Sequence, residues 1–167
     1  ATGTVGQSWN IDANFTSSNS NVISNDTANA IISITGCAVD FTLQWSSISF
    51  GALSPNTDQN AAPGNSNASY NITINSGSCT LDLYTKGTDL TNGTNSFRIG
   101  VGNITWSNVS NTYSTSVNLT SSNVPINKSV VPVVNVSTWY WLNVPSVFAG
   151  RYNGTITITG VENGQSP

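Results

Sequence analysis

Few side chains in this sequence are of the types that carry out acid–base or nucleophilic chemistry. The chain has no histidine, so a Ser–His or Cys–His nucleophile pair cannot be built. Its carboxylates are spread along the chain with no motif that joins two of them, which gives little support to a paired-carboxylate mechanism. They are Asp12, Asp26, Asp40, Asp58, Asp82, Asp89 and Glu162. We therefore expect a protein that is not an enzyme, with no catalytic residues and no cofactor.

Metal and nucleotide sites are not predicted either. Two cysteines without any histidine are a poor donor set for zinc, and no calcium loop of alternating aspartates is present. Gly100 and Gly102 form a G-V-G triplet, but the third glycine and the following helix of a dinucleotide site are missing. A Lys–Asn crosslink that uses Lys86 or Lys128 beside an acid is a minor alternative.

The chemistry that the sequence does indicate is covalent modification of asparagine. Eleven asparagines stand in N-x-Ser/Thr triplets: Asn14, Asn25, Asn67, Asn71, Asn92, Asn103, Asn108, Asn118, Asn127, Asn135 and Asn153. In a chain so rich in Ser and Thr this number only modestly exceeds chance. Several of these asparagines alternate with apolar residues, so a strand would turn them outward, as N-glycosylation requires. We predict N-glycans, first at Asn71 and Asn118; the alternative is a polar face that serves solubility alone.

Composition points to an exported protein without a nucleic-acid or membrane partner. Charged residues make up 7% of the chain, and four scattered basic residues with a net charge of −3 form no footprint for nucleic acid. No apolar run approaches the ~18 residues of a membrane span. The sequence starts at Ala1 rather than Met, which we interpret as a mature extracellular chain whose signal peptide has been removed. In such a chain Cys37 and Cys79 are predicted to form a disulfide.

The elements that must position these residues are strands. Alternating apolar runs recur between Gly, Pro, Asn and Ser clusters, which is typical of an antiparallel β-sandwich. We expect strands near residues 30–34, 37–45, 48–53, 70–74, 81–83, 97–101, 113–119 and 152–158, a loop at 58–68, and a proline-interrupted edge strand at 124–137. In the cluster at 139–142, Trp139 and Trp141 are predicted to enter the core and Tyr140 to face solvent. The alternative is an exposed sugar-binding platform.

The N-terminal stretch VGQSWNIDANF, residues 5–15, has the clearest period of two. One face would carry Val5, Gln7, Trp9, Ile11, Ala13 and Phe15. A polar stretch follows, so this strand can either fold onto its own sandwich or complete the sheet of a neighbouring copy. Burying its large apolar side chains contributes about 6–12 kcal/mol. Ordering its residues costs about 1–2 kcal/mol each, so the strand also needs a backbone ladder.

The alternating N-terminal strand, the turn ISFGALSPNT, the late segment WYWLNVPSVFAGRYNGTITITG, the many glycosylation triplets and the low charge together resemble the archaeal thread pilins. The resemblance covers essentially the whole chain. It implies an all-β, immunoglobulin-like antiparallel sandwich over residues 18–167, preceded by a donor strand in residues 1–17. It also implies identical subunits joined head to tail in a helical, glycosylated homopolymer at the cell surface, for adhesion or biofilm. The rival hypothesis is a monomeric, self-complemented surface domain that binds glycans through residues 139–141.

Overall fold

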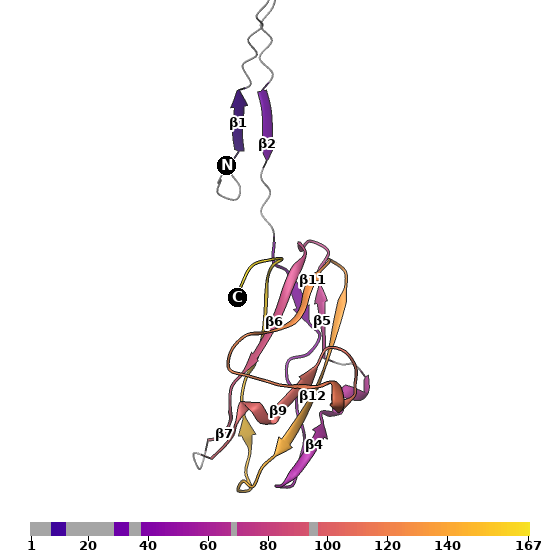
Figure 1. Ribbon diagram of the computed structural model, residues 1–167, viewed down its shortest axis with the longest axis vertical. Helices are drawn as coiled ribbons and strands as arrows, with labels where there is room; N and C mark the ends of the chain where they lie inside the picture. Colours follow the sequence, from indigo (N-terminus) through magenta and orange to yellow (C-terminus); the bar gives the residue numbers. More distant parts are fainter. Residues whose placement is uncertain (1–7, 13–28, 34–37, 68–69, 94–96) are drawn as a thin grey trace, which may run out of the picture. The chain divides into compact units, whose positions relative to one another are not determined.

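The computed structural model of this chain describes residues 8–12, 29–33, 38–67, 70–93 and 97–167 (Figure 1). The chain forms two compact units, residues 1–37 and residues 38–167, and we call the second unit the body. Every paired strand is antiparallel, so the predicted all-β class is confirmed. The predicted boundary between residues 17 and 18 lies outside the described residues. No helix of the described residues is both long and apolar enough to cross a membrane.

The N-terminal unit contains one described strand pair. Strand β1 (Ser8–Asp12) pairs with β2 (Asn29–Ser33), and Trp9 stands opposite Ile32 in the register. Strand β1 lies inside the predicted strand at 5–15, and β2 overlaps the one predicted at 30–34. The predicted donor-strand residues Val5, Gln7, Ala13 and Phe15 lie outside the described residues.

The larger sheet of the body is built around one long strand. Its order is β10-β9-β12-β5-β3, and β4 also pairs with β12. The strands are β3 (Phe41–Leu43), β4 (Thr57–Ala61), β5 (Tyr70–Ile74), β9 (Ile104–Ser107), β10 (Val117–Asn118) and β12 (Asn135–Val144). Because β12 pairs with β5 along its first half and with β9 and β4 along its second, it joins both halves of this sheet.

Two smaller sheets complete the body. One has the order β11-β6-β14, and the other has the order β13-β7-β8. Their strands are β6 (Leu81–Gly87), β7 (Leu90–Asn92), β8 (Arg98–Ile99), β11 (Val124–Val130), β13 (Tyr152–Asn153) and β14 (Ile156–Glu162); short 3-10 turns are η1 (Pro63–Asn67), η2 (Val101–Asn103) and η3 (Tyr113–Thr115). Strand β11 is an edge strand with two register shifts, as its proline predicts.

The core lies between these sheets and follows the period of two. In β5, Ile72 and Ile74 are fully buried, and in β6 so are Leu81 and Leu83. In β12 the buried face carries Tyr140, whose side chain has no solvent exposure and whose pKa burial raises to about 12. The prediction is therefore wrong for Tyr140 and for Trp139, whereas Trp141 is buried at 4% exposure.

Tyr140 is in the core, whereas Trp139 faces outward and is half-buried. Trp141 lies on the same outer face, where the ring of Tyr113 covers it at 5.9 Å between ring centroids. The three aromatic side chains therefore form no common exposed platform.

Three further segments differ from the sequence-based expectation. Residues 57–61 form strand β4 rather than a loop, because β12 supplies partners: Asn60 Nδ2 donates to Leu142 O at 2.9 Å and Gln59 N donates to Asn143 Oδ1 at 2.7 Å. Residues 113–119 form η3 and the two-residue β10 rather than one strand. Residues 48–53 form no strand.

Candidate functional site

One side of the core is bounded by the terminal strands of two different sheets. Strand β3 ends the larger sheet, and β14 ends the sheet that contains β6. The two strands meet at Gly160, where an added Cβ would lie 2.8 Å from Cε1 of Phe41. Each strand has one paired edge among the described residues, to β5 and to β6 respectively, so the other edge of each can accept a further strand.

The segment that continues from β3 has apolar side chains but no backbone ladder. Among the described residues, backbone-to-backbone hydrogen bonds join residues 44–56 to the rest of the body only at the ends of the segment. Gln44 N donates to Asn71 O at 3.0 Å, and Asn56 N donates to Pro145 O at 3.4 Å. Between these two points, Gly51 N donates to Ser49 Oγ and Ser54 O accepts from Thr57 Oγ1, but no backbone ladder to another segment is formed.

The apolar side chains along this side are only partly covered. Eight of them pack against the core cluster and yet are only half-buried: Phe41, Leu43, Trp45, Ile48, Phe50, Leu53, Ile156 and Ile158. We call this set the open edge. Trp45 packs edge-on against Tyr70 and Tyr140, and its indole Nε1 is buried without a hydrogen-bond partner. The core is thus left partly uncovered along this side, between two sheets.

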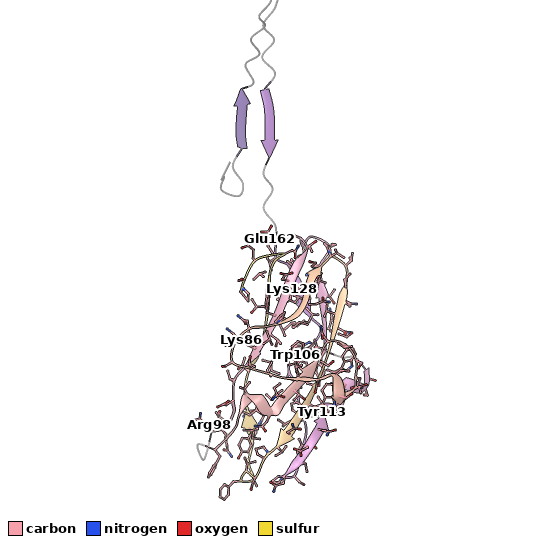
Figure 2. The ribbon with its side chains drawn as sticks, viewed as in Figure 1. Lys86, Arg98, Trp106, Tyr113, Lys128 and Glu162 are labelled. Atoms are coloured by element: carbon pink, nitrogen blue, oxygen red, sulfur yellow. The ribbon has the colours of Figure 1, made fainter. Side chains whose placement is uncertain are left out.

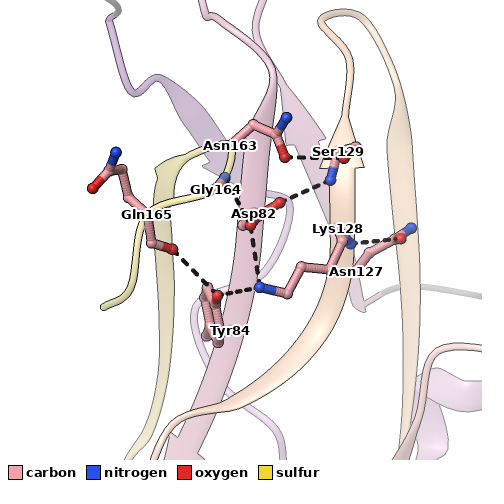
Figure 3. A network of polar contacts seen from close by, with 8 residues as sticks. All are labelled: Asp82, Tyr84, Asn127, Lys128, Ser129, Asn163, Gly164 and Gln165. Atoms are coloured by element: carbon pink, nitrogen blue, oxygen red, sulfur yellow. Dashed lines mark hydrogen bonds and ion pairs between the residues drawn. The ribbon is translucent and has the colours of Figure 1, made fainter.

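A second feature is a polar cluster around Asp82, on the outer face of β6 (Figure 3). The Asp82 side chain is 2% exposed and accepts hydrogen bonds from Ser129 N at 2.9 Å, Gly164 N at 3.1 Å and Lys128 Nζ at 3.1 Å. Lys128 Nζ also donates to the Tyr84 hydroxyl. Ser129 and Gly164 both have positive φ, 54° and 85°. The cluster ties β11, β6 and the residues after β14 together.

The electrostatics of this cluster keep both partners charged. Hydrogen bonds from Ser129 N, Gly164 N and Lys128 hold the pKa of Asp82 below its usual value, although burial opposes them. Hydrogen bonds to Tyr84 and Asp82 raise the pKa of Lys128. A crosslink would need a neutral amine, so this arrangement favours an ion pair and gives no support to the Lys128 crosslink.

A third feature is an open cavity of about 800 Å³ beside the start of β14, with a lining of mixed polarity. Its lining includes Lys86, Asp89 and the threonines at 88, 91, 155 and 157. The Asp89 carboxylate already accepts from Val101 N at 2.8 Å and from Arg98 Nη1 at 3.4 Å. The cavity therefore offers hydroxyl groups and one ammonium group, but no pair of free acid and base.

The predicted glycosylation sites fall into three groups. Six are exposed: Asn67, Asn108, Asn118, Asn127, Asn135 and Asn153. Asn71 and Asn103 are half-buried, and Asn92 is buried at 5% exposure. Asn14 and Asn25 lie outside the described residues. Solvent exposure thus ranks these asparagines as candidates for glycan attachment, which the N-x-Ser/Thr triplet alone does not.

Hydrogen bonding of the amide nitrogen, the atom that would carry the glycan, ranks them further. Asn103 Nδ2 donates to Gly100 O at 3.2 Å, and Asn108 Nδ2 donates to Ile126 O. Asn92 Nδ2 faces Gly150 so closely that an added Cβ there would lie 2.0 Å away. Asn127, in contrast, uses its amide oxygen to accept from Lys128 N, and its nitrogen points away from the cluster in Figure 3.

The predicted disulfide is only half inside the described residues. Cys79 is half-buried beside the core and is not a free thiol. Cys37 lies outside the described residues, so the Cys37–Cys79 pairing stays a prediction. No group of three or more His, Cys, Asp or Glu residues gathers in the part of the chain that the structure describes. Comparisons with protein-family models, with curated proteins and with solved structures each find no match for this chain.

Proposed function

We propose that this chain is the structural subunit of an extracellular, N-glycosylated filament of the archaeal thread pilin type, polymerised head to tail by donor-strand complementation. In this proposal the body is an immunoglobulin-like pilin sandwich that lacks one strand. Residues 5–15 of the next copy, which include β1, supply that strand. The filament would serve surface adhesion or biofilm formation.

The observation that carries the proposal is the open edge. An uncovered strand edge with half-exposed apolar side chains is a template for strand addition, and monomeric proteins usually cover or charge such edges. Here β14 carries one charged residue, Glu162 at its end, and the segment 44–56 carries none. An added strand with one apolar face would bury that face on the core and would pair its backbone with the free edges.

The N-terminal strand has the properties that the open edge requires. Residues 5–15 alternate, so one face is apolar except for Gln7, and the other carries Gly6 and polar side chains. In this structure β1 pairs with β2 over five residues. An isolated two-stranded ladder of this kind is only marginally stable in water, so β1 can leave β2 at little cost when a larger apolar surface becomes available.

The rival, a monomeric glycan-binding domain, has less support. It relied on an exposed aromatic surface at residues 139–141, and two of these three side chains are buried.

The test is a single substitution with a matched control. Ile11→Asp places a carboxylate on the apolar face of the donor strand, where burial without a partner costs several kcal/mol, so polymerisation should be lost. Asn10→Asp adds the same carboxylate to the same strand but on its polar face, and it should still polymerise. Electron microscopy and the ladder of multimers on SDS gels measure the outcome. Filaments formed by Ile11→Asp as readily as by Asn10→Asp would refute the proposal.

A second measurement locates the acceptor. A peptide of residues 1–16, added to the Ile11→Asp chain, should slow amide hydrogen exchange in residues 44–56 and in β14, because it supplies the missing ladder. The same peptide with Ile11→Asp should protect neither segment. Protection that appeared elsewhere in the body would mean that the open edge is not the acceptor.

A further inference from the structure

Large apolar side chains that are exposed on the body gather at its two ends. Eight such residues are described. Val133 and Val134 bond to Ile74, and Val39 lies beside Gly160, close to Glu162 in the chain. Phe97 precedes Arg98 and contacts Phe148, and the remaining two residues are Val109 and Val117. In Figure 2 the two ends are marked by the labels of Glu162 and Arg98. Single exposed apolar residues need no explanation, but two clusters at opposite ends of one unit do.

The first cluster is the turn between β11 and β12, residues 131–134, which we call the valine loop. Val133 is 79% exposed and Val131 is 51% exposed. The loop is held in place by Ile74, which donates its N–H to Val134 O at 3.0 Å and accepts from Val133 N at 2.9 Å. The exposed valines are therefore presented on a fixed backbone.

Val133 also has a strained backbone. Its φ is 60°, a left-handed conformation that is a genuine outlier for a β-branched side chain. Asparagine or glycine would adopt this φ with less strain. Either residue would also expose less apolar surface to water at this position, where the valine is 79% exposed. A strained, exposed valine is disfavoured in a free monomer, which suggests that its side chain has a use when the loop contacts a partner.

The second cluster is an aromatic pair at the far end of the body, beyond the end of β6. The rings of Phe97 and Phe148 stack with their centroids 4.5 Å apart, and the side chains are 40% and 65% exposed. The Tyr152 hydroxyl donates to Phe148 O at 2.9 Å and so holds this loop against β13. The exposed side chain of Arg151 lies next in the chain to Tyr152.

We infer that the valine loop of one copy packs on the aromatic pair of the next copy, so that the two ends of the body form the contact between successive subunits. This inference rests on the proposed function and adds a second contact to the donor strand. The chain enters the body at the valine-loop end, where Cys79 N donates to Ala38 O and Asn75 N donates to Asp40 O. In the proposal, the chain that carries the donor strand therefore joins the body at this end.

Charge favours this pairing over a symmetric contact. Asp40 and Glu162 are exposed at the valine-loop end, and the charge of nearby Lys128 is paired with Asp82. Two such ends that faced each other would therefore bring acidic groups together. The aromatic end carries Arg151 and the Arg98–Asp89 ion pair. A contact between the acidic end of one copy and the arginine-bearing end of the next is thus the better match. Such a head-to-tail contact can be repeated from copy to copy and builds an open filament rather than a closed dimer.

Val133→Asn tests the inference with effects of opposite sign on folding and on assembly. The substitution relieves the strain at φ 60°, so the melting temperature of the unpolymerised chain should rise. It removes the apolar contact, so the critical concentration for filament growth should rise about tenfold, as for the loss of one interface anchor. Val109→Asn is the matched control, since Val109 is 72% exposed at neither end and its loss should leave assembly unchanged.

A charge swap identifies the partner surface. Val133→Glu and Phe148→Arg should each impair growth, and the double variant should restore it, because every junction then pairs one glutamate with one arginine. Light scattering and electron microscopy of the full chain report growth, and peptide 1–16 bound to each variant in the Ile11→Asp background reports donor-strand binding. Normal growth of both single variants, or no rescue in the double variant, would overturn the inference. If peptide 1–16 failed to bind the Ile11→Asp chain that carries no other substitution, the result would instead count against the proposed function.

Discussion

Asp82 is a buried acidic residue whose carboxylate is surrounded by hydrogen-bond donors. Its buried carboxylate receives two backbone N–H groups and one ammonium group, and these donors come from two segments that are distant in the sequence from β6. A buried carboxylate is stable only when such partners are present. Asp82 therefore connects the edge strand β11 and the residues after β14 to the central strand β6.

This cluster predicts how stability depends on pH. The folded-state pKa of Asp82 is lowered, so its contribution is present above its usual pKa, near 3.8, and is lost as pH falls through the folded value. The folded-state pKa of Lys128 is raised, so its contribution is present below its usual pKa, near 10.5, and is lost as pH rises through the folded value. Urea unfolding across this range should show a plateau between the two limits.

Asp82→Asn should lower the plateau and flatten its acid side, because the carboxylate that titrates there is gone. The matched control is Asp58→Asn, which changes an exposed carboxylate on β4 and should leave the profile close to that of the wild type. An acid side that stayed unchanged in Asp82→Asn would show that other carboxylates set the acid limit.

At the scale of elements, strand position decides which asparagines can carry a glycan. Asn118 on β10 and Asn153 on β13 are exposed, whereas Asn92 on β7 is buried against Gly150. Because β7 pairs with both β13 and β8, Asn92 cannot turn outward without disturbing two ladders. We therefore predict glycans at Asn118 and Asn153 and none at Asn92.

Glycopeptide mapping of the exported protein tests this ranking. Asn118→Gln and Asn153→Gln should each remove one glycan from the intact mass, and Asn92→Gln should leave the mass of the glycans unchanged. A modified Asn92 would mean that the glycan is attached before β7 is packed. Bare Asn118 and Asn153 would leave solubility as the better explanation of the polar surface.

At the scale of the whole molecule, the predicted Cys37–Cys79 disulfide would restrict the unfolded chain and contribute about 2–4 kcal/mol to the free energy of unfolding. Intact-mass analysis of the denatured, non-reduced chain after alkylation should find no free thiol. Reduction should lower the melting temperature of the wild type and should have no effect on a Cys37→Ser, Cys79→Ser variant. Two alkylated cysteines before reduction would contradict the pairing.

The sequence by itself determined the all-β class and several strands of the body. The alternating residues Tyr70, Ile72 and Ile74 lie in β5, and Leu81 and Leu83 lie at the start of β6, as predicted. A strand with one buried face needs apolar residues at every second position. The proline in β11 correctly predicted an edge strand, because proline has no N–H group to donate to a ladder. These features depend only on local chemistry.

The face of β12 that enters the core was decided by tertiary structure. Residues 139–142 are apolar at both parities, so the cluster alone does not say which face is buried. Only the longer strand resolves it, since Val136, Tyr140 and Val144 share one parity and all lie in the core. The burial of Asn92 likewise depends on Gly150, which is far away in the sequence.

Tertiary structure also decided where the core is left open. The polar residues of β4 form a strand because their backbone pairs with β12. The apolar residues at 48–53 form none, and no described strand pairs with them. Strand formation requires a neighbour for the backbone, and the pattern of one segment does not reveal whether a neighbour exists. The alternation of residues 5–15 could therefore be recognised in the sequence, but the open edge that would receive it emerges only when the two sheets are assembled.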